Sequence, residues 1–473
     1  MTLAYVLVFV VIAAILGVAT RRGGRLPVLL VISALAVYAL QPALPVRGLD
    51  FWLPTLTLGL TVLGWVLTTP RQQRIWRDNW PAVAILGGIV ILLGLTRYLG
   101  FSLPLTASNP PQILPILVVL LIVAATGFLL WRFSKPGKLI LSAAFLFVIL
   151  IFVFLKVPAL SEWTSQVLRG WNGQSTLLAS PLDLRWLGFS YIAFRLLHTL
   201  RDRQSGRLPP VSLSEYVVYV IFFPALSAGP IDRIERFVGD LRRPLLLISD
   251  DYGEAGKRLV VGLFKKFVIA DTLGLVALNA TNATQVRSAG WAWVLLYAYA
   301  FQIYCDFSGY TDIAIGLGRL LGIKLPENFR APYLKPNLTQ FWNNWHMTLT
   351  QWFRAYFFNP VTRALRSGKK KFSIPSIVFI TQMGTMVLIG LWHGVTWNFI
   401  AWGVWHGLGL FVHNRWSEWT KGRFALLSIR WQKVLNVGGV LLTFHFVAIG
   451  WVFFALPSLS ISGHFLQALV GWR

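Results

Sequence analysis

The sequence of 473 residues is poor in cysteine and in acidic residues, with one cysteine, Cys305, and 17 Asp and Glu. One cysteine excludes an internal disulfide bond and a cysteine-rich metal site. Charged residues make up only 13% of the chain, against about a quarter in an ordinary soluble domain, while hydrophobic residues make up 56%. This balance excludes an ordinary soluble domain and indicates an all-α, polytopic integral membrane protein.

Basic residues, in contrast, are abundant. The chain has 43 Lys and Arg, which gives a net charge of +26. Such a surplus can indicate nucleic-acid binding, but here the cations lie in short clusters between long apolar runs. Cytoplasmic loops of membrane proteins show this arrangement. We therefore predict the lipid bilayer, and no nucleic acid, as a partner.

The first third of the chain contains six apolar runs of membrane-spanning length, at residues 3–19, 26–44, 51–68, 81–99, 113–131 and 139–155. Lys and Arg are frequent in the first, third and fifth links and rare in the second and fourth. The positive-inside rule then places the N-terminus outside a plasma (inner) membrane. We read the first run as a retained helix and not as a signal peptide, because no basic residue precedes it. Residues 162–180 are predicted to form an external polar loop.

The second half is less regular. The apolar stretch 216–226 is too short to span a bilayer and predicts a re-entrant or broken helix. We expect the apolar run 289–305 to end in turns, because Asp, Ser and Gly in residues 306–312 favour turns and helix caps. Asp306 and Asp312 are six residues apart, which is not a spacing of one helix face, although a paired-carboxylate site stays an alternative. The whole pattern predicts roughly 11–13 membrane helices, some of them broken.

A histidine lies within the apolar sequence 389–408. This residue, His393, is flanked by Gly390 and Gly394, which leave room for a chain or ligand beside the ring. A charged side chain at membrane depth costs roughly 2.5–3.5 kcal/mol, so an ionisable residue there is a candidate functional group. A neutral structural histidine that is hydrogen bonded to a neighbouring helix is the alternative.

Other histidines have simpler interpretations. Residues 339–358 carry large apolar side chains at steps of three and four, which predicts one amphipathic helix with His346 beside its apolar stripe. His406 follows His393 by thirteen residues and would face away from it on an unbroken helix. His406 and His413 share a helix face, where exposure at the cytoplasmic surface explains both. His445 is predicted to be structural.

Five ordered sequence blocks resemble the membrane-bound O-acyltransferase (MBOAT) family, in the bacterial branch typified by alginate O-acetylation and teichoic-acid D-alanylation. The paired signature is FWNNWHMTLTQWFR at 341–354 and GLWHGVTWNF at 390–399. The supporting blocks are FFPALSAGPIDR at 222–233, GLFKKFVIAD at 262–271 and YCDFSGYTDIAIG at 304–316. The resemblance implies a helical core with a central tunnel at 181–456, preceded by extra N-terminal membrane helices at 1–180 and followed by a tail at 457–473.

The resemblance also implies an enzyme. Its essential histidine falls on His393 and its second histidine on His346. It would move an acyl group, with acetyl as the first choice, from a cytoplasmic thioester such as acetyl-CoA or an acyl-carrier thioester to a hydroxyl of an extracytoplasmic cell-envelope polysaccharide. The transfer would be direct or would use an extracytoplasmic acyltransferase partner. Transfer of D-alanine to teichoic acid, or a non-enzymatic transporter or scaffold, are the alternatives.

Acyl transfer to a hydroxyl needs a base, and a neutral imidazole with an ordinary pKa of about 6.5 can serve. We predict His393 as this base, and His346, Asn398 or an indole N–H as donor to the developing oxyanion. The chain has no Gly-x-Ser-x-Gly elbow, which favours direct transfer over a covalent acyl-enzyme. No bound cofactor or metal is expected. The side chains predicted to bind substrate are Asn398, Trp392, Trp345, Asp306 and Ser308.

Overall fold

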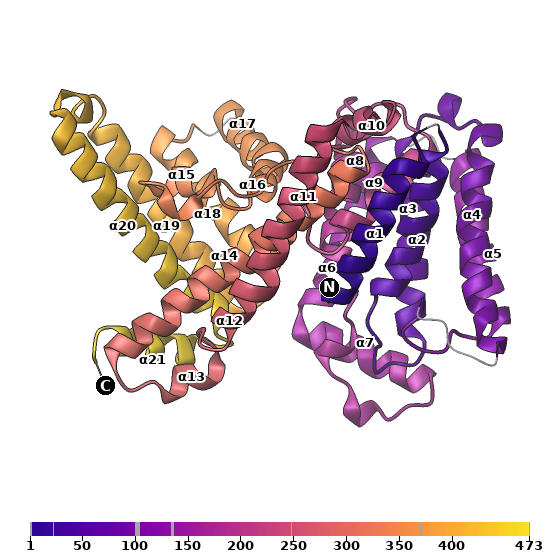
Figure 1. The fold of residues 1–473 in the computed structure, drawn as a ribbon, viewed down its shortest axis with the longest axis horizontal. Coiled ribbons are helices and arrows are strands. Elements are labelled where there is room, and N and C mark those ends of the chain that lie inside the picture. The colour runs from indigo at the N-terminus through magenta and orange to yellow at the C-terminus, as the bar shows by residue number, and fades with distance from the viewer. Residues whose placement is uncertain are drawn as a thin grey trace. The chain divides into compact units, whose positions relative to one another are not determined.

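The computed structural model describes residues 2–21, 23–99, 105–133, 137–246, 248–368 and 371–472, and these residues form helices and loops without a strand. They divide into two compact units, unit 1 (Met1–Leu259 and Ile313–Pro326) and unit 2 (Val260–Asp312 and Glu327–Arg473). The predicted all-helical class is confirmed (Figure 1). Residues 100–104, 134–136 and 369–370, which fall in three predicted links, lie outside the described residues.

Unit 1 begins with the six predicted N-terminal helices, and their predicted bounds are confirmed to within a few residues. These helices are α1 (Leu3–Ala19), α2 (Arg25–Leu40), α3 (Leu49–Thr68), α4 (Trp76–Leu95), α5 (Ile113–Phe133) and α6 (Lys138–Lys156). The unit continues with α7 (Pro158–Trp171), α8 (Phe189–Gln204), α9 (Leu213–Ile221), α10 (Ile234–Arg242) and most of α11 (Ser249–Leu263). The long apolar runs therefore specify their helices directly.

The loop predicted at 162–180 is partly wrong, because α7 occupies its first half. One buried carboxylate, that of Asp183, holds this helix in place. It accepts hydrogen bonds from Ser165 Oγ at 2.6 Å and from Arg169 Nε at 2.8 Å, both on α7. Ser165 and Arg169, which are polar and suggested a solvated loop, are thus paired with Asp183, which lies 18 and 14 residues later in the sequence.

The short helix predicted at 216–226 is confirmed as α9, which is followed by a 3-10 turn at Phe223–Ala225. A capping box between Ser212 and Glu215 begins the helix. Arg195 of α8 is buried beside its other end and donates to the carbonyl oxygens of Val220 at 2.7 Å and Ala225 at 2.8 Å. The backbone groups freed by the broken helix are therefore satisfied inside the protein.

Unit 2 contains the remaining helices and two π-helical segments, at Phe264–Ala270 and Arg354–Phe358. Its helices are α12 (Asp271–Gly274), α13 (Ala280–Gln285), part of α14 (Ala289–Leu320), α15 (Leu338–Trp342), α16 (Met347–Phe353), α17 (Asn359–Ser367), α18 (Ile374–His393), α19 (Trp397–Trp419), α20 (Ile429–Ala455) and α21 (Leu459–Leu469). The last of these lies within the predicted C-terminal tail.

Six helices among the described residues are long and apolar enough to cross a membrane, namely α3, α4, α5, α6, α18 and α20. Shorter apolar helices are α1, α2 and the segment Leu213–Ala225. The chain is therefore a multi-pass membrane protein. The larger number of 11–13 membrane helices, the orientation of the termini and the domain boundaries at 180 and 456 stay predictions.

The turn predicted at 306–312 is wrong, because α14 continues to Leu320. Its two carboxylates pair with lysines of the π-helical segment Phe264–Ala270: Asp306 with Lys266 at 2.5 Å and Asp312 with Lys265 at 2.8 Å. A Cβ on Gly309, between them, would lie 2.8 Å from the carbonyl oxygen of Gly262, so glycine permits this close approach. Each carboxylate has its own cation, which argues against a paired-carboxylate site.

Helices α18 and α19 pack closely, and the chain turns between them at residues 394–396. A Cβ on Gly390 would lie 2.2 Å from the carbonyl oxygen of Phe399, and one on Gly394 would lie 2.7 Å from the Phe399 ring. The room that these glycines provide beside His393 is thus occupied by Phe399 of α19. The break also places the first turn of α19 beside the end of α18.

Asp183→Asn should destabilise unit 1, because it removes the charge that compensates buried Arg169. Burial by itself raises the pKa of Asp183, but the hydrogen bonds from Ser165 and Arg169 and the charge of Arg169 outweigh it and lower this pKa. The stabilisation is therefore present above the ordinary pKa of Asp and disappears as the pH falls through the folded-state value. We expect a loss of about 3–5 kcal/mol in the free energy of unfolding near neutral pH.

Denaturant unfolding in detergent at several pH values measures this loss. The exposed Asp250→Asn substitution is the control and should leave stability nearly unchanged. Equal stability of Asp183→Asn and the unsubstituted protein at pH 7 would contradict the role given to this carboxylate.

Candidate active site

The His393 side chain lies at the C-terminal end of α18, among aromatic rings of three helices. Its ring centroid is 4.5 Å from that of Trp392, 4.7 Å from Phe454 and 5.9 Å from both Phe399 and Trp402. The side chain is half-buried. His393 therefore packs against protein rings on part of its surface, and the end of α18 presents its imidazole at a helix terminus.

The single helix predicted at 339–358 is wrong, since α15 ends at Trp342 and α16 begins at Met347. His346 lies at this break with a φ of 42°, in the left-handed region that a β-carbon disfavours. Non-glycine residues in such sparsely populated conformations cost about 1–3 kcal/mol and cluster at functional sites. The strain is a second reason, independent of sequence, to regard His346 as a functional residue.

The imidazole of His346 is almost completely buried. Its ring contacts Phe307 of α14 at 4.7 Å, and its Nδ1 lies 3.2 Å from Asn328 Oδ1. Burial lowers the pKa of His346 to about 3. This histidine is therefore neutral at physiological pH.

Trp392 joins the two histidines. Its ring centroid lies 4.5 Å from that of His393 and 6.2 Å from that of His346. The two predicted catalytic residues, 47 positions apart in the sequence, thus share one aromatic neighbour in unit 2. We call the group formed by His346, Trp392 and His393 the histidine cluster.

Some residues predicted to bind substrate have packing roles. Trp345 is buried among aromatic rings, with Phe329 at 5.1 Å and Trp451 at 5.1 Å. The amide nitrogen of Asn398 donates to Leu456 O at 2.7 Å and to Ser462 Oγ at 3.0 Å, which ties α19 to the end of α20 and to α21. Asn398 therefore has no amide hydrogen left for an oxyanion, and we withdraw it as a candidate donor.

The other two predicted binding residues lie on α14. Asp306 is occupied by its ion pair with Lys266. Ser308 is buried one residue from Phe307, which contacts His346. Substrate contact by Asp306, Ser308, Trp392 and Trp345 stays a prediction.

Sequence reasoning missed two residues near the site. Asn328 is not among the predicted site residues, and nothing in its local sequence signals its contact with His346. The prediction that His406 lies at the surface is wrong, because its side chain is fully buried with its ring 4.9 Å from that of Trp402.

His445 is structural as predicted, with Tyr297 Oη at 2.8 Å from Nε2 and Leu441 O at 2.7 Å from Nδ1.

A large apolar cavity lies elsewhere, in unit 1. It has a volume of about 680 Å³ and is lined mainly by aliphatic and aromatic side chains of α3, α4 and α5. Neither His393 nor His346 lines it. The mainly apolar lining suits hydrocarbon. The tunnel implied by the family resemblance stays a prediction.

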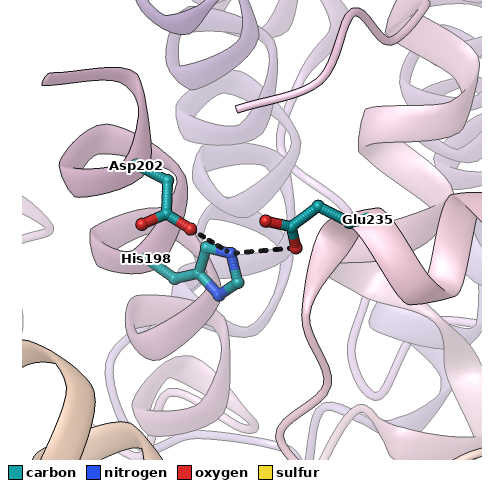
Figure 2. Close-up of side chains that lie close together, drawn as sticks. All are labelled: His198, Asp202 and Glu235. Carbon is teal, nitrogen blue, oxygen red and sulfur yellow. Dashed lines mark ion pairs between the residues drawn. The ribbon is translucent and has the colours of Figure 1, made fainter. Parts of the chain in front are cut away.

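A second cluster of titratable side chains lies in unit 1 (Figure 2). His198 Nε2 is 3.1 Å from Asp202 Oδ2 and 4.0 Å from Glu235 Oε2, and one ligand atom of each residue lies within 4.8 Å of the other two. Groups of this kind and spacing could hold a divalent cation. However, Arg207 already pairs with Asp202 Oδ1 at 3.1 Å. An ion-pair network of imidazole, carboxylates and guanidinium therefore accounts for the cluster without a metal.

Comparison with known proteins identifies the fold family. Residues 112–458 match the family described as MBOAT, membrane-bound O-acyltransferase family. The matched range contains the whole histidine cluster, and it begins before residue 181, where we placed the start of the core.

Three relatives illustrate the range of related proteins. A teichoic acid D-alanyltransferase of Streptococcus thermophilus is 30% identical over 375 residues, which cover 75% of this chain and 85% of the relative. A probable alginate O-acetylase of Pseudomonas syringae is 35% identical over 60% of this chain and 51% of its own length. A peptidoglycan O-acetyltransferase of Helicobacter pylori is 35% identical over 54% of this chain and 46% of its own length. The chain thus spans about half the length of the last two.

Asp202→Asn tests the ion-pair interpretation of the unit 1 cluster. Because it leaves buried His198 and exposed Arg207 without their shared carboxylate, we expect a loss of about 1–3 kcal/mol in the free energy of unfolding. Glu235→Gln is the matched control, since this partly exposed carboxylate should contribute less than about 1 kcal/mol. Thermal unfolding with and without a chelator completes the test. A midpoint that falls on chelation and recovers with a divalent cation would show that the cluster is a metal site.

Proposed function

This chain belongs to the membrane-bound O-acyltransferase family, and on that premise we propose that it transfers an acyl group, with acetyl as the first candidate, from a cytoplasmic thioester to a hydroxyl of an extracytoplasmic envelope polysaccharide. Family membership makes the chain an acyltransferase and sets aside the transporter and the scaffold. The observation that supports the location of the chemistry is the histidine cluster, in which two imidazoles share Trp392.

His393 is the proposed general base. The acceptor hydroxyl oxygen attacks the thioester carbonyl carbon while an imidazole nitrogen of His393 takes the hydroxyl proton. The carbon–sulfur bond of the tetrahedral intermediate then breaks, and His393 returns the proton to the leaving thiolate. The new ester and the free thiol account for all atoms, and His393 ends in its starting form.

The negative charge on the tetrahedral intermediate needs hydrogen-bond donors. With Asn398 committed to Leu456 and Ser462, the remaining predicted donors are His346 and the indole N–H groups of Trp392 and Trp402, which lie beside His393. Each indole offers one N–H and no lone pair for a competing proton. Replacement of these rings by phenylalanine would preserve most of the apolar wall and remove only the donor.

The predicted topology gives the reaction a direction. A thioester donor, either acetyl-CoA or an acyl-carrier thioester, is a cytoplasmic compound, whereas envelope polymers are extracytoplasmic. A base reached from both sides would let the acyl group cross the bilayer in one transfer. We include an extracytoplasmic acyltransferase as a possible second component that completes delivery to the polymer.

D-alanyl transfer to teichoic acid is the second candidate. One observation favours it: the alignment with the Streptococcus thermophilus teichoic acid D-alanyltransferase covers 85% of that protein, whereas those with the two acetylating relatives cover about half. Identity, on the other hand, is higher for the two acetylating relatives, at 35% against 30%.

His393→Ala should abolish acyl transfer by the purified protein, because the attacking hydroxyl loses its base. General-base catalysis contributes about 10²–10⁴-fold, so we expect a fall of at least about 100-fold in kcat. His464→Ala is the control, because this exposed histidine lies on α21. Transfer that survives in a folded His393→Ala variant would remove the base assignment.

Deletion of the protein in its host should remove one acyl modification from one envelope polymer. Mass spectrometry of envelope glycans that are released enzymatically, so that their ester groups stay intact, identifies the lost group, which is one acetyl group per site under the first candidate. Loss of D-alanine from teichoic acid instead would establish the second candidate. Complementation with the His393→Ala variant separates lost catalysis from lost assembly.

A further inference from the structure

Asn328 holds the break at His346 in place through both its backbone and its side chain. Its carbonyl oxygen accepts from the backbone N–H of Met347 at 3.0 Å. Its side-chain Oδ1 accepts from the backbone N–H of Thr348 at 3.2 Å and from Thr348 Oγ at 2.7 Å. The side chain of Asn328 is completely buried. Asn328 thus caps the first two N–H groups of α16 from outside that helix.

The same oxygen lies 3.2 Å from Nδ1 of His346, and this contact determines where the imidazole proton is. A backbone N–H can only donate, so the Asn328 atom that faces Thr348 is the carbonyl oxygen and not the amide nitrogen. An oxygen of this kind can only accept. Nδ1 of His346 therefore carries the proton, and Nε2 of the neutral ring carries the lone pair.

Nε2 of His346 is buried and has no hydrogen-bond partner within the described part of the chain. The rings of Phe307 and Trp392 contact the same imidazole, and neither is hydrogen bonded to its Nε2 in the described residues. Buried acceptors are normally satisfied, and those that are not need a specific explanation. A ligand with a hydrogen-bond donor would supply the missing partner.

From these contacts we infer that Asn328 is a positioning residue that fixes His346 in the Nδ1-protonated form, so that Nε2 accepts a hydrogen bond from an N–H or O–H of the bound substrate. The inference rests on the proposed function. It also corrects one expectation from the sequence, because an imidazole in this form cannot donate through Nε2 to an oxyanion. The substrate group that donates to Nε2 is not the reacting hydroxyl, because the single proton of that hydroxyl goes to His393.

Asn328→Asp is the decisive substitution. An Asp carboxylate keeps both acceptor contacts to Thr348 and the contact to Nδ1, so α16 keeps its cap. Its negative charge favours the protonated imidazole and raises the pKa of His346. Protonated Nε2 donates and no longer accepts, so activity should fall as His346 becomes charged.

Because His393, as the proposed base, sets the acid limb of kcat/KM, the effect is read on His346 itself: by ¹⁵N NMR we expect its imidazole to titrate at least one pH unit higher in Asn328→Asp, a change of about tenfold in its protonation equilibrium. At high pH the activity should approach that of the unsubstituted protein. The matched control is Asn337→Asp, where Oδ1 caps α15 through Gln340 N at 2.9 Å. A role in capping alone would leave the titration of His346 unchanged in both variants, and that result would overturn the inference.

Nitrogen NMR of protein labelled with ¹⁵N-histidine in detergent reports the tautomer without any activity assay. The signal of His346 is assigned by its absence in His346→Gln. A protonated Nδ1 with an unprotonated Nε2 supports the inference, and the opposite tautomer refutes it. If the unsubstituted protein transfers no acyl group, the proposed function fails while this NMR result still decides the role of Asn328.

Discussion

Backbone groups at every helix interruption of an apolar protein have to find partners within the protein, because hydrocarbon offers none. Three buried side chains meet this requirement here. Arg195 binds the carbonyl groups at the end of α9, Asn398 binds the end of α20, and Asn328 binds the start of α16. Asn328 acts at the helix break that contains His346. Asn398 acts at the end of α20, close to Phe454, whose ring contacts His393. The positions of the reactive groups therefore follow from how the protein satisfies its own backbone.

Aromatic packing supplies the rest of the site. Phe341, Trp345 and Trp451 form a continuous set of ring contacts in unit 2, and Trp402 extends it to His393. Rings have few rotamers and large contact areas, so they hold an imidazole at low entropic cost. The signature motifs that identified the family contain many of these rings. Their abundance reflects packing of the site as much as contact with substrate.

Local sequence was sufficient for the N-terminal helices, because long apolar runs leave few alternatives to a spanning helix. The family motifs also single out His393 and His346, and the structure brings both against Trp392, while their catalytic roles stay predictions. Local sequence failed where partners are distant: α14 continues through Asp306 and Asp312 because lysines some 40 residues earlier neutralise them. The helix break at His346 could not be predicted for the same reason. Asn328, which stabilises it, lies 18 residues away, and no local sequence pattern marks Asn328.

The ring wall around His393 also bears on fidelity. Phe454, Phe399 and Trp392 cover part of the half-buried imidazole mainly with carbon, so few groups on that side can hold an ordered solvent molecule. Water is the most abundant rival nucleophile for any activated ester. If His393 is the base, as we propose, this partial cover favours an alcohol that brings its own binding contacts over water.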